Sequence, residues 1–203
     1  MLRLRSLLCL LLCCALPLAA AQCAIPSARP EPSKRKFVSP AVDSFIEALL
    51  PRFLDPNMAT LFQNCLPNTL DTTVYLHTPS PSADSFIITG DIIAMWQRDS
   101  TNQVWPYLRW AGADPALRSL IAGLIARQAA NVLVQPYANA YQVDASMPGP
   151  HANDATFPAS AAADNRIFEF KWETDSLSNV LRLSAGYHAA TGDTSPFDAS
   201  GLM

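Results

Sequence analysis

The sequence predicts an all-α fold built from helices in successive pairs, with one short β-hairpin. Apolar residues recur at helical spacing in five segments between residues 40 and 192. Several of these segments begin with a capping residue followed by proline, which is typical of the first turn of a helix. The strand–helix–strand alternation that builds a parallel sheet is not found between them, so paired helices are the expected architecture.

The composition narrows the class of partner. The chain has 203 residues, a formal net charge of −3 and 15% charged residues. A protein that binds nucleic acid needs a basic face, so this charge balance argues against nucleic acid as a partner. The length allows one domain or a piece of a larger one.

Residues 1–21 predict a secretory signal peptide. Arg3 and Arg5 supply a positive start, residues 7–18 are apolar, and the alanines at 19–21 fit a cleavage site. The apolar run is short for a bilayer span of about 20 residues. We therefore expect an extracellular protein without a stable membrane span, and the alternative is an uncleaved signal anchor in the ER or Golgi.

Cleavage of the signal peptide would leave two of the five cysteines in the mature chain. Cys23 and Cys65 would remain after cleavage and could form one disulfide in an oxidising compartment. They lie far apart in the chain without a histidine cluster, so we expect no metal site and no cofactor. Residues 22–38 are rich in proline and basic residues, which predicts a linker that resists regular structure.

The first half of the remaining chain predicts two helices and a hairpin. The first helix begins with the cap-and-proline pair at Ser39 and runs to about residue 53. A second helix is expected over residues 57–66. Residues 72–77 and 85–89 are rich in β-branched and aromatic residues and are separated by a proline–serine turn, so they predict two short strands.

The second half predicts three more helices. One is expected over residues 101–111, bent by Pro106, which lacks a backbone donor. The next covers residues 115–134 and starts with a strong Asp–Pro signal. Residues 135–165 show little periodicity, and loops of that length are usually functional or disordered. Helical spacing returns at residue 168 and ends at Gly192.

Residues 90–108 interleave tryptophan and tyrosine with aspartate, arginine, glutamine and asparagine. A helix that is merely stable needs one apolar stripe, and this mixture interrupts it. A sugar site does need such a mixture, because aromatic faces pack on pyranose C–H groups while carboxylates, amides and guanidinium groups pair with hydroxyls. The alternative is a partly buried helix with a satisfied Arg–Asp pair.

Residues 166–177 form a second polar stretch. On a helix, Glu169 and Glu173 would share one face, and Lys171 and Asp175 another. Aromatic residues alternate with these charges and leave no consistently solvated side. Buried carboxylates with charged neighbours acquire separated pKa values, and one can then stay protonated as a general acid in glycoside cleavage requires. The alternative is a solvated helix face with ordinary ion pairs.

The two stretches together resemble glycoside hydrolase family 125, the exo-α-1,6-mannosidases, and the fungal-type secretory members are the most similar. The motifs are Met95-Trp96-Gln97-Arg98-Asp99-Ser100 and Lys171-Trp172-Glu173-Thr174-Asp175-Ser176-Leu177, in the family's order and separation. The resemblance covers residues 40–195. It implies the N-terminal part of an (α/α)6 barrel and metal-independent hydrolysis with inversion, releasing terminal α-1,6-linked mannose from a glycan.

The resemblance also implies roles for single residues. Asp175 matches the general acid that protonates the departing oxygen. The subsite for the terminal mannose would be lined by Trp96, Arg98, Asp99, Gln103, Lys171 and Glu173, and Asp91 belongs to the same motif as a further binding residue. Phe170 departs from the family's pattern, which usually has a small or basic residue there, and this would alter the pocket wall.

Length is the larger departure. Six helix pairs need on the order of 250 residues or more, so residues 39–203 would be an incomplete catalytic domain. An inverting enzyme needs a second carboxylate to activate water, and in this family it comes from a later part of the barrel. We therefore expect a fragment that lacks the general base and is inactive alone. The alternatives are a non-catalytic mannoside-binding remnant and a helical scaffold for protein partners.

Overall fold

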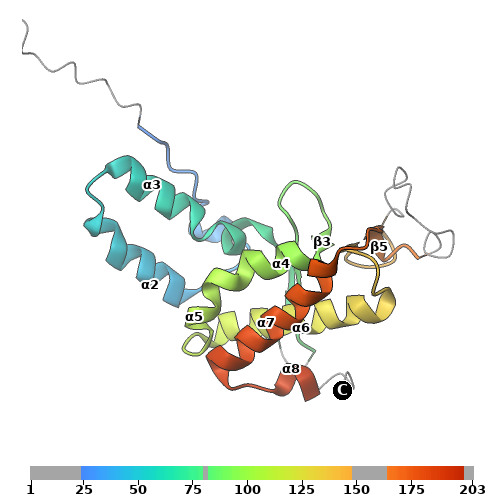
Figure 1. Ribbon diagram of the computed structural model, residues 1–203. Coiled ribbons are helices and arrows are strands. Elements are labelled where there is room, and N and C mark those ends of the chain that lie inside the picture. The colour runs from blue at the N-terminus through green and yellow to red at the C-terminus, as the bar shows by residue number, and fades with distance from the viewer. Residues whose placement is uncertain (1–23, 80–81, 148–163, 199–203) are drawn as a thin grey trace, which may run out of the picture.

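The computed structural model describes residues 24–79, 82–147 and 164–198. The predicted signal peptide, Cys23 and part of the long segment before residue 164 lie outside these residues. The described chain is mostly helical, with two small antiparallel sheets (Figure 1). In chain order, the elements are η1 (Pro32–Lys34), α2 (Pro40–Leu49), η2 (Leu50–Arg52), α3 (Pro56–Cys65), the π-helix η3 (Thr69–Thr73), β1 (Val74–Thr78), β2 (Asp84–Ile87), β3 (Met95–Trp96), α4 (Gln97–Val104), η4 (Trp105–Tyr107), α5 (Leu108–Ala111), α6 (Pro115–Val134), β4 (Ala140–Tyr141), β5 (Ile167–Glu169), α7 (Thr174–Thr191) and α8 (Ser195–Asp198).

The helix starts follow the capping signals of the sequence. Ser39 accepts a hydrogen bond from the backbone of Val42 at the start of α2. Asp114 caps α6 in the same way, and the Ser39 hydroxyl donates to its carboxylate at 2.6 Å. Helix α3 starts at Pro56, one residue earlier than predicted, because Asp55 is its cap. Satisfied backbone donors at these ends fix where the helices begin.

The predicted hairpin is confirmed, and it packs on α6. Strands β1 and β2 pair antiparallel, with an irregular register after Val74. Helix α6 lies against β2 at Gly123, where an added Cβ would lie 2.5 Å from the Ser85 hydroxyl. The glycine therefore allows a close approach of helix and strand. Around this contact lies the main core, whose largest fully buried side chains are Ile46, Leu70, Phe86, Ile87, Met95, Leu117, Leu120, Ile121, Leu124 and Tyr187. Tyr141 and Ile167 are buried in a second, smaller cluster.

Helix α6 agrees with the prediction for residues 115–134. Among the described residues, it is also the one helix long and apolar enough to span a membrane by length and composition. Its apolar residues Leu117, Leu120 and Leu124 are completely buried. A core helix meets the same length and composition criteria, and we interpret α6 as one.

The helix predicted over residues 101–111 is three shorter elements. Helix α4 starts earlier, at Gln97, and ends at Val104, and the 3-10 turn η4 and the short α5 follow. Pro106 explains the interruption, because it has no N–H for the α-helical ladder. Helix α7 packs against α4, α5 and α6 (Figure 1) and buries Leu183 and Tyr187.

The prediction that a helix starts at residue 168 is wrong. Residues 167–169 form strand β5, and α7 starts only at Thr174. Strands β3, β4 and β5 form a three-stranded antiparallel sheet that the sequence did not predict. Aromatic and charged residues alternate with a period of two in this stretch, which is the period of a strand. The predicted sharing of a helix face by Glu169 and Glu173 is therefore wrong too.

Residues 24–38 are packed against the body of the protein, which differs from the unstructured linker expected. Arg29 donates to Asp71 at 2.8 Å and also pairs with Asp43 on α2. Backbone bonds from Lys36 and Phe37 to the η3 segment continue the attachment. Hydrogen bonds between opposite charges outweigh the local preference of a proline-rich sequence for disorder.

Candidate active site

The two polar stretches meet where the first turns of α4 and α7 face each other. Arg98 on α4 donates from Nη1 to Oδ2 of Asp175 on α7 at 3.1 Å. The same nitrogen lies 3.5 Å from Oε2 of Glu173, and Nε lies 3.5 Å from Oδ2 of Asp99. One guanidinium therefore connects three of the predicted carboxylates. Its hydrogen bond with Asp175, together with the nearby negative charges, raises the pKa of Arg98.

The expectation that these carboxylates are buried is wrong for Asp175. Its side chain is 48% exposed. It lies in the first turn of α7, and the N-terminal end of a helix favours a negative charge. Exposed ion pairs contribute little to stability, about 0–1 kcal/mol each. The Arg98 cluster is therefore open to solvent, and its charges are accessible to a ligand.

Trp96 and Lys171 meet at a second centre, Glu169 on β5. The Glu169 carboxylate accepts bonds from Trp96 Nε1 at 3.1 Å, Asn139 Nδ2 at 2.7 Å and Lys171 Nζ at 2.6 Å. Burial raises the pKa of Glu169, but these three bonds outweigh it and hold the pKa below its usual range. Trp96 also packs edge-on against Phe168 at 5.4 Å between ring centroids. Trp96 is thus fixed against the small sheet.

Replacing Glu169 with Gln should make the free energy of unfolding depend less on pH in the acid range. A carboxylate with a lowered folded pKa contributes stability above its unfolded pKa of about 4.3, and this contribution is lost as pH falls through the folded pKa. The variant should be less stable at pH 7 and lose less stability between about pH 5 and 3. Urea unfolding across this range measures it, with Glu47→Gln on the exposed side of α2 as the control. An unchanged loss of stability on acidification would contradict the assignment.

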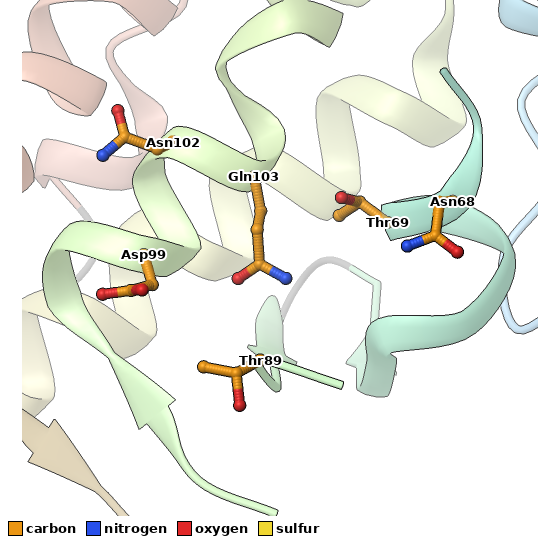
Figure 2. Close-up of a pocket in the computed structure, with 6 residues that line it drawn as sticks. All are labelled: Asn68, Thr69, Thr89, Asp99, Asn102 and Gln103. Atoms are coloured by element: carbon orange, nitrogen blue, oxygen red, sulfur yellow. The ribbon is translucent and has the colours of Figure 1, made fainter. Parts of the chain in front are cut away.

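Asp99 and Gln103, both on α4, line an open cavity of about 450 Å³. Figure 2 shows Gln103 pointing across this space toward Thr89. Gln103 donates to the Ile88 carbonyl at 2.9 Å, which fixes its amide. The cavity is lined by Asn68, Thr69, Thr89, Asp99, Asn102 and Gln103.

Two oxygens of this cavity lining lack a hydrogen bond within the described part of the chain. They are Oε1 of Gln103 and Oδ2 of Asp99, and both are buried as atoms, although the ion pair with Arg98 partly compensates Oδ2. A buried acceptor without a donor costs about 1–3 kcal/mol, so such atoms are paired in most proteins. The amide, hydroxyl and carboxylate side chains that line the cavity can exchange hydrogen bonds with a polyhydroxylated ligand.

Asp91 lies apart from these contacts, in an exposed loop between β2 and β3. Gly90 starts this loop with a φ of 130°, a conformation that favours glycine. The hydrogen bond from Thr89 to Asp91 is long, at 3.5 Å. Because Thr89 lines the cavity, Asp91 lies near its edge rather than in the Arg98 cluster.

Sequence reasoning missed Asn139 and the far wall of the cavity, Asn68 and Thr69. Asn139 is buried and reaches both Glu169 and the backbone of Lys171. Residues 137–141 alternate tyrosine or asparagine with alanine, and this period of two could have indicated a strand near a site. Asn68 and Thr69 carry no comparable local signal, because the π-helix and the fold around it bring them to the cavity.

No group of three or more His, Cys, Asp or Glu side chains within residues 24–79, 82–147 and 164–198 is arranged to hold a metal ion. Cys65 is exposed, and its predicted partner lies outside these residues.

Sequence and structure comparisons relate this chain to known proteins. Residues 55–202 match the sequence family described as metal-independent α-mannosidase, GH125. The meiotically up-regulated gene 157 protein of Schizosaccharomyces pombe is 41% identical over 181 residues, which are 88% of this chain and 36% of that protein. A Streptococcus pneumoniae metal-independent α-mannosidase, solved in a non-productive complex with α-1,6-mannobiose, superposes with a TM-score of 0.68.

The solved structure is 38% identical, and the match covers 80% of this chain and 37% of that chain. This chain therefore spans little more than a third of the length of either relative. The likeness confirms the predicted fold class, an all-α part of this family's (α/α)6 barrel.

Proposed function

Because this chain belongs to the GH125 family of metal-independent α-mannosidases, we propose that its site serves the hydrolysis of terminal α-1,6-linked mannose on glycans. The proposed reaction is exo-acting and inverts the anomeric carbon. The observation that carries the proposal is the contact between Arg98 and Asp175, which joins the two motifs beside a cavity lined by polar side chains. The mannobiose in the Streptococcus pneumoniae complex supports the substrate class.

Different side chains of the site bind the sugar and transfer the proton. Hydroxyls of the terminal mannose donate to the side chains of Asp99 and Gln103, two of the residues that line the cavity. Asp175 gives a proton to the glycosidic oxygen as the C–O bond breaks, while water attacks the anomeric carbon from the opposite face and loses its proton to a base. Arg98 can release Asp175 for this step, because Glu173 and Asp99 remain as its partners.

We propose that the base that activates water is not one of the carboxylates around Arg98 and belongs to the part of the relatives' length that this chain does not match. The chain corresponds to 36–37% of the two relatives. The carboxylates of Asp99, Glu173 and Asp175 share a single guanidinium, whereas the base of an inverting enzyme lies about 6.5–9.5 Å from the acid across the sugar. The purified chain should then bind mannosides without releasing mannose. Measurable release, or a transcript with a stop codon directly after Met203, would contradict this assignment.

The activity is tested in the protein expressed from the complete transcript. We expect mannose release from α-1,6-mannobiose but not from the α-1,2- and α-1,3-linked isomers, with the β-anomer as first product in a proton NMR time course. The α-anomer as first product would exclude inversion. Saturable mannoside binding without hydrolysis of any isomer would favour the alternative function, a non-catalytic mannoside-binding remnant.

An Arg98→Ala variant is expected to bind methyl α-mannoside about tenfold to a hundredfold more weakly. The substitution leaves three carboxylates close together without their cation, so the cavity wall loses its fixed geometry. Arg98→Lys should lose less, since it keeps the charge but not the forked donors.

Titration calorimetry on the purified chain measures the effect of the Arg98 variants. Arg118→Met is the matched control, because Arg118 also links two helices, α6 and α5, through the Ala111 carbonyl at 3.1 Å, and neither residue lines the cavity. Affinity within twofold of the unmodified chain for Arg98→Ala would contradict the role.

We also propose that the protein enters the secretory pathway. The basic start, apolar run and small residues of 1–21 support this. N-terminal sequencing of the protein secreted by a eukaryotic host should begin near Gln22, and an intact N-terminus on a membrane-bound protein would indicate an anchor instead.

A further inference from the structure

Two exposed aromatic side chains lie together next to the candidate active site. The rings of Tyr137 and Trp172 are 5.3 Å apart between centroids and meet edge to face at 62°. Tyr137 is 56% exposed and Trp172 55% exposed. Tyr137 follows helix α6, and Trp172 lies between β5 and α7. An exposed aromatic pair of this kind is a common sign of a binding surface.

Hydrogen bonds of the buried Asn139 hold the segments that carry these two rings together. Its side chain donates to the Glu169 carboxylate at 2.7 Å and accepts from the Lys171 backbone at 3.0 Å. Its own backbone N–H donates to the Glu169 carbonyl at 3.3 Å. Asn139 lies two residues after Tyr137, and Lys171 directly precedes Trp172. The aromatic pair is therefore fixed before any ligand arrives, which lowers the entropy cost of binding.

The position of the pair relative to the acid defines what it could bind. Trp172 directly precedes Glu173, and Glu173 shares the Arg98 guanidinium with Asp175. Asp99 lines the sugar cavity and pairs with Nε of that guanidinium, whereas Glu173 and Asp175 pair with its Nη1. Strand β3 leads directly into α4 and joins β5 through β4, and the start of α7 meets Arg98 in the first turn of α4 (Figure 1). The aromatic pair, the proposed acid and the cavity are therefore linked through neighbouring residues around Arg98.

We propose that Tyr137 and Trp172 form a platform for the sugar on the leaving side of the scissile bond, which rests on the proposed function. A mannose residue bound there would pack the C–H face of its ring on the Trp172 indole, while the Tyr137 ring supports the indole edge-on. The platform would make the protein prefer an oligosaccharide over a simple mannoside. Sugar binding would also explain why two large aromatic side chains leave apolar surface exposed to water, where it contributes no hydrophobic stabilisation.

Binding by the purified chain tests the platform without requiring turnover. Titration calorimetry compares methyl α-mannoside, which fills the terminal subsite, with reduced α-1,6-mannotriose, which extends to the leaving side. We expect the trisaccharide to bind about tenfold more tightly, and Trp172→Ala to remove that advantage while leaving methyl mannoside within twofold. Trp172→Phe should restore part of the advantage. Tyr75→Ala, which truncates a 48% exposed aromatic on β1, is the matched control.

The outcomes separate the two proposals. An unmodified chain that binds neither sugar would overturn the proposed function and the platform with it. A chain that binds both sugars equally, or a Trp172→Ala variant that keeps the trisaccharide advantage, would overturn the platform alone. Equal loss of both sugars in Trp172→Ala would also overturn it, because the tryptophan would then shape the terminal subsite instead. Far-UV circular dichroism confirms that each variant is folded.

Discussion

An Asp175→Asn protein expressed from the complete transcript is expected to lose about 10²–10⁴-fold in kcat for α-1,6-mannobiose, the range for removing a general acid. The glycosidic oxygen of a sugar is a poor leaving group and needs a proton as it departs. The amide keeps the size of Asp175 and can still accept a bond from Arg98, so the geometry of the first turn of α7 should persist. KM should change much less than kcat.

The leaving group provides the internal control. The fluoride of α-mannosyl fluoride leaves without needing a proton from the protein. The variant should therefore cleave this substrate with a much smaller loss of kcat. Glu47→Gln, on the exposed surface of α2, should leave both rates unchanged. Equal losses on mannobiose and the fluoride would contradict the acid role and point to binding or positioning.

Replacing Arg29 with Ala is expected to lower the free energy of unfolding by about 2–4 kcal/mol. Arg29 is itself 10% exposed, and its partner Asp71 is 2% exposed. Its loss would leave the Asp71 carboxylate buried with the more distant Arg35, at 3.7 Å, as its remaining cation. Burial lowers the pKa of Arg29, but the bonds to Asp71 and Asp43 outweigh it and raise the pKa, so the pair stays charged.

Urea unfolding of the purified chain measures this loss of stability. Arg52→Ala is the matched control, because Arg52 is exposed at the end of η2. Asp71 lies in η3, whose Thr69 lines the sugar cavity, so mannoside binding should weaken together with stability. A change below about 0.5 kcal/mol, the usual range for surface substitutions, would show that the N-terminal segment is only loosely attached.

Local chemistry accounts for the parts of the fold that the sequence predicted well. The caps at Ser39 and Asp114 satisfy backbone donors within a few residues, and so they fix helix starts regardless of the rest of the chain. Helix α6 and the β1–β2 hairpin were found for the same reason, since periodicity and turn residues act over short distances.

The errors fall where distant segments determine the local structure. Residues 166–173 contain both helix and strand signals. Pairing with β4, itself inside a segment without periodicity, makes residues 167–169 a strand. The N-terminal segment has the composition of a linker, yet the carboxylates of Asp43 and Asp71 bind its arginines. Neither partner can be identified from the neighbouring residues alone.

The same division holds for the candidate site. The sequence by itself determined which residue types are present and in which two motifs, because carboxylates, amides and aromatics at those positions do not suit a purely structural helix. The tertiary structure decided their grouping, with Asp175 and Glu173 at Arg98, Trp96 and Lys171 at Glu169, and Asp99 and Gln103 in the cavity. The Trp96–Glu169 and Arg98–Asp175 contacts join residues more than 70 positions apart, and only packing of α4 against α7 and of β3 with β4 and β5 brings them within bonding distance.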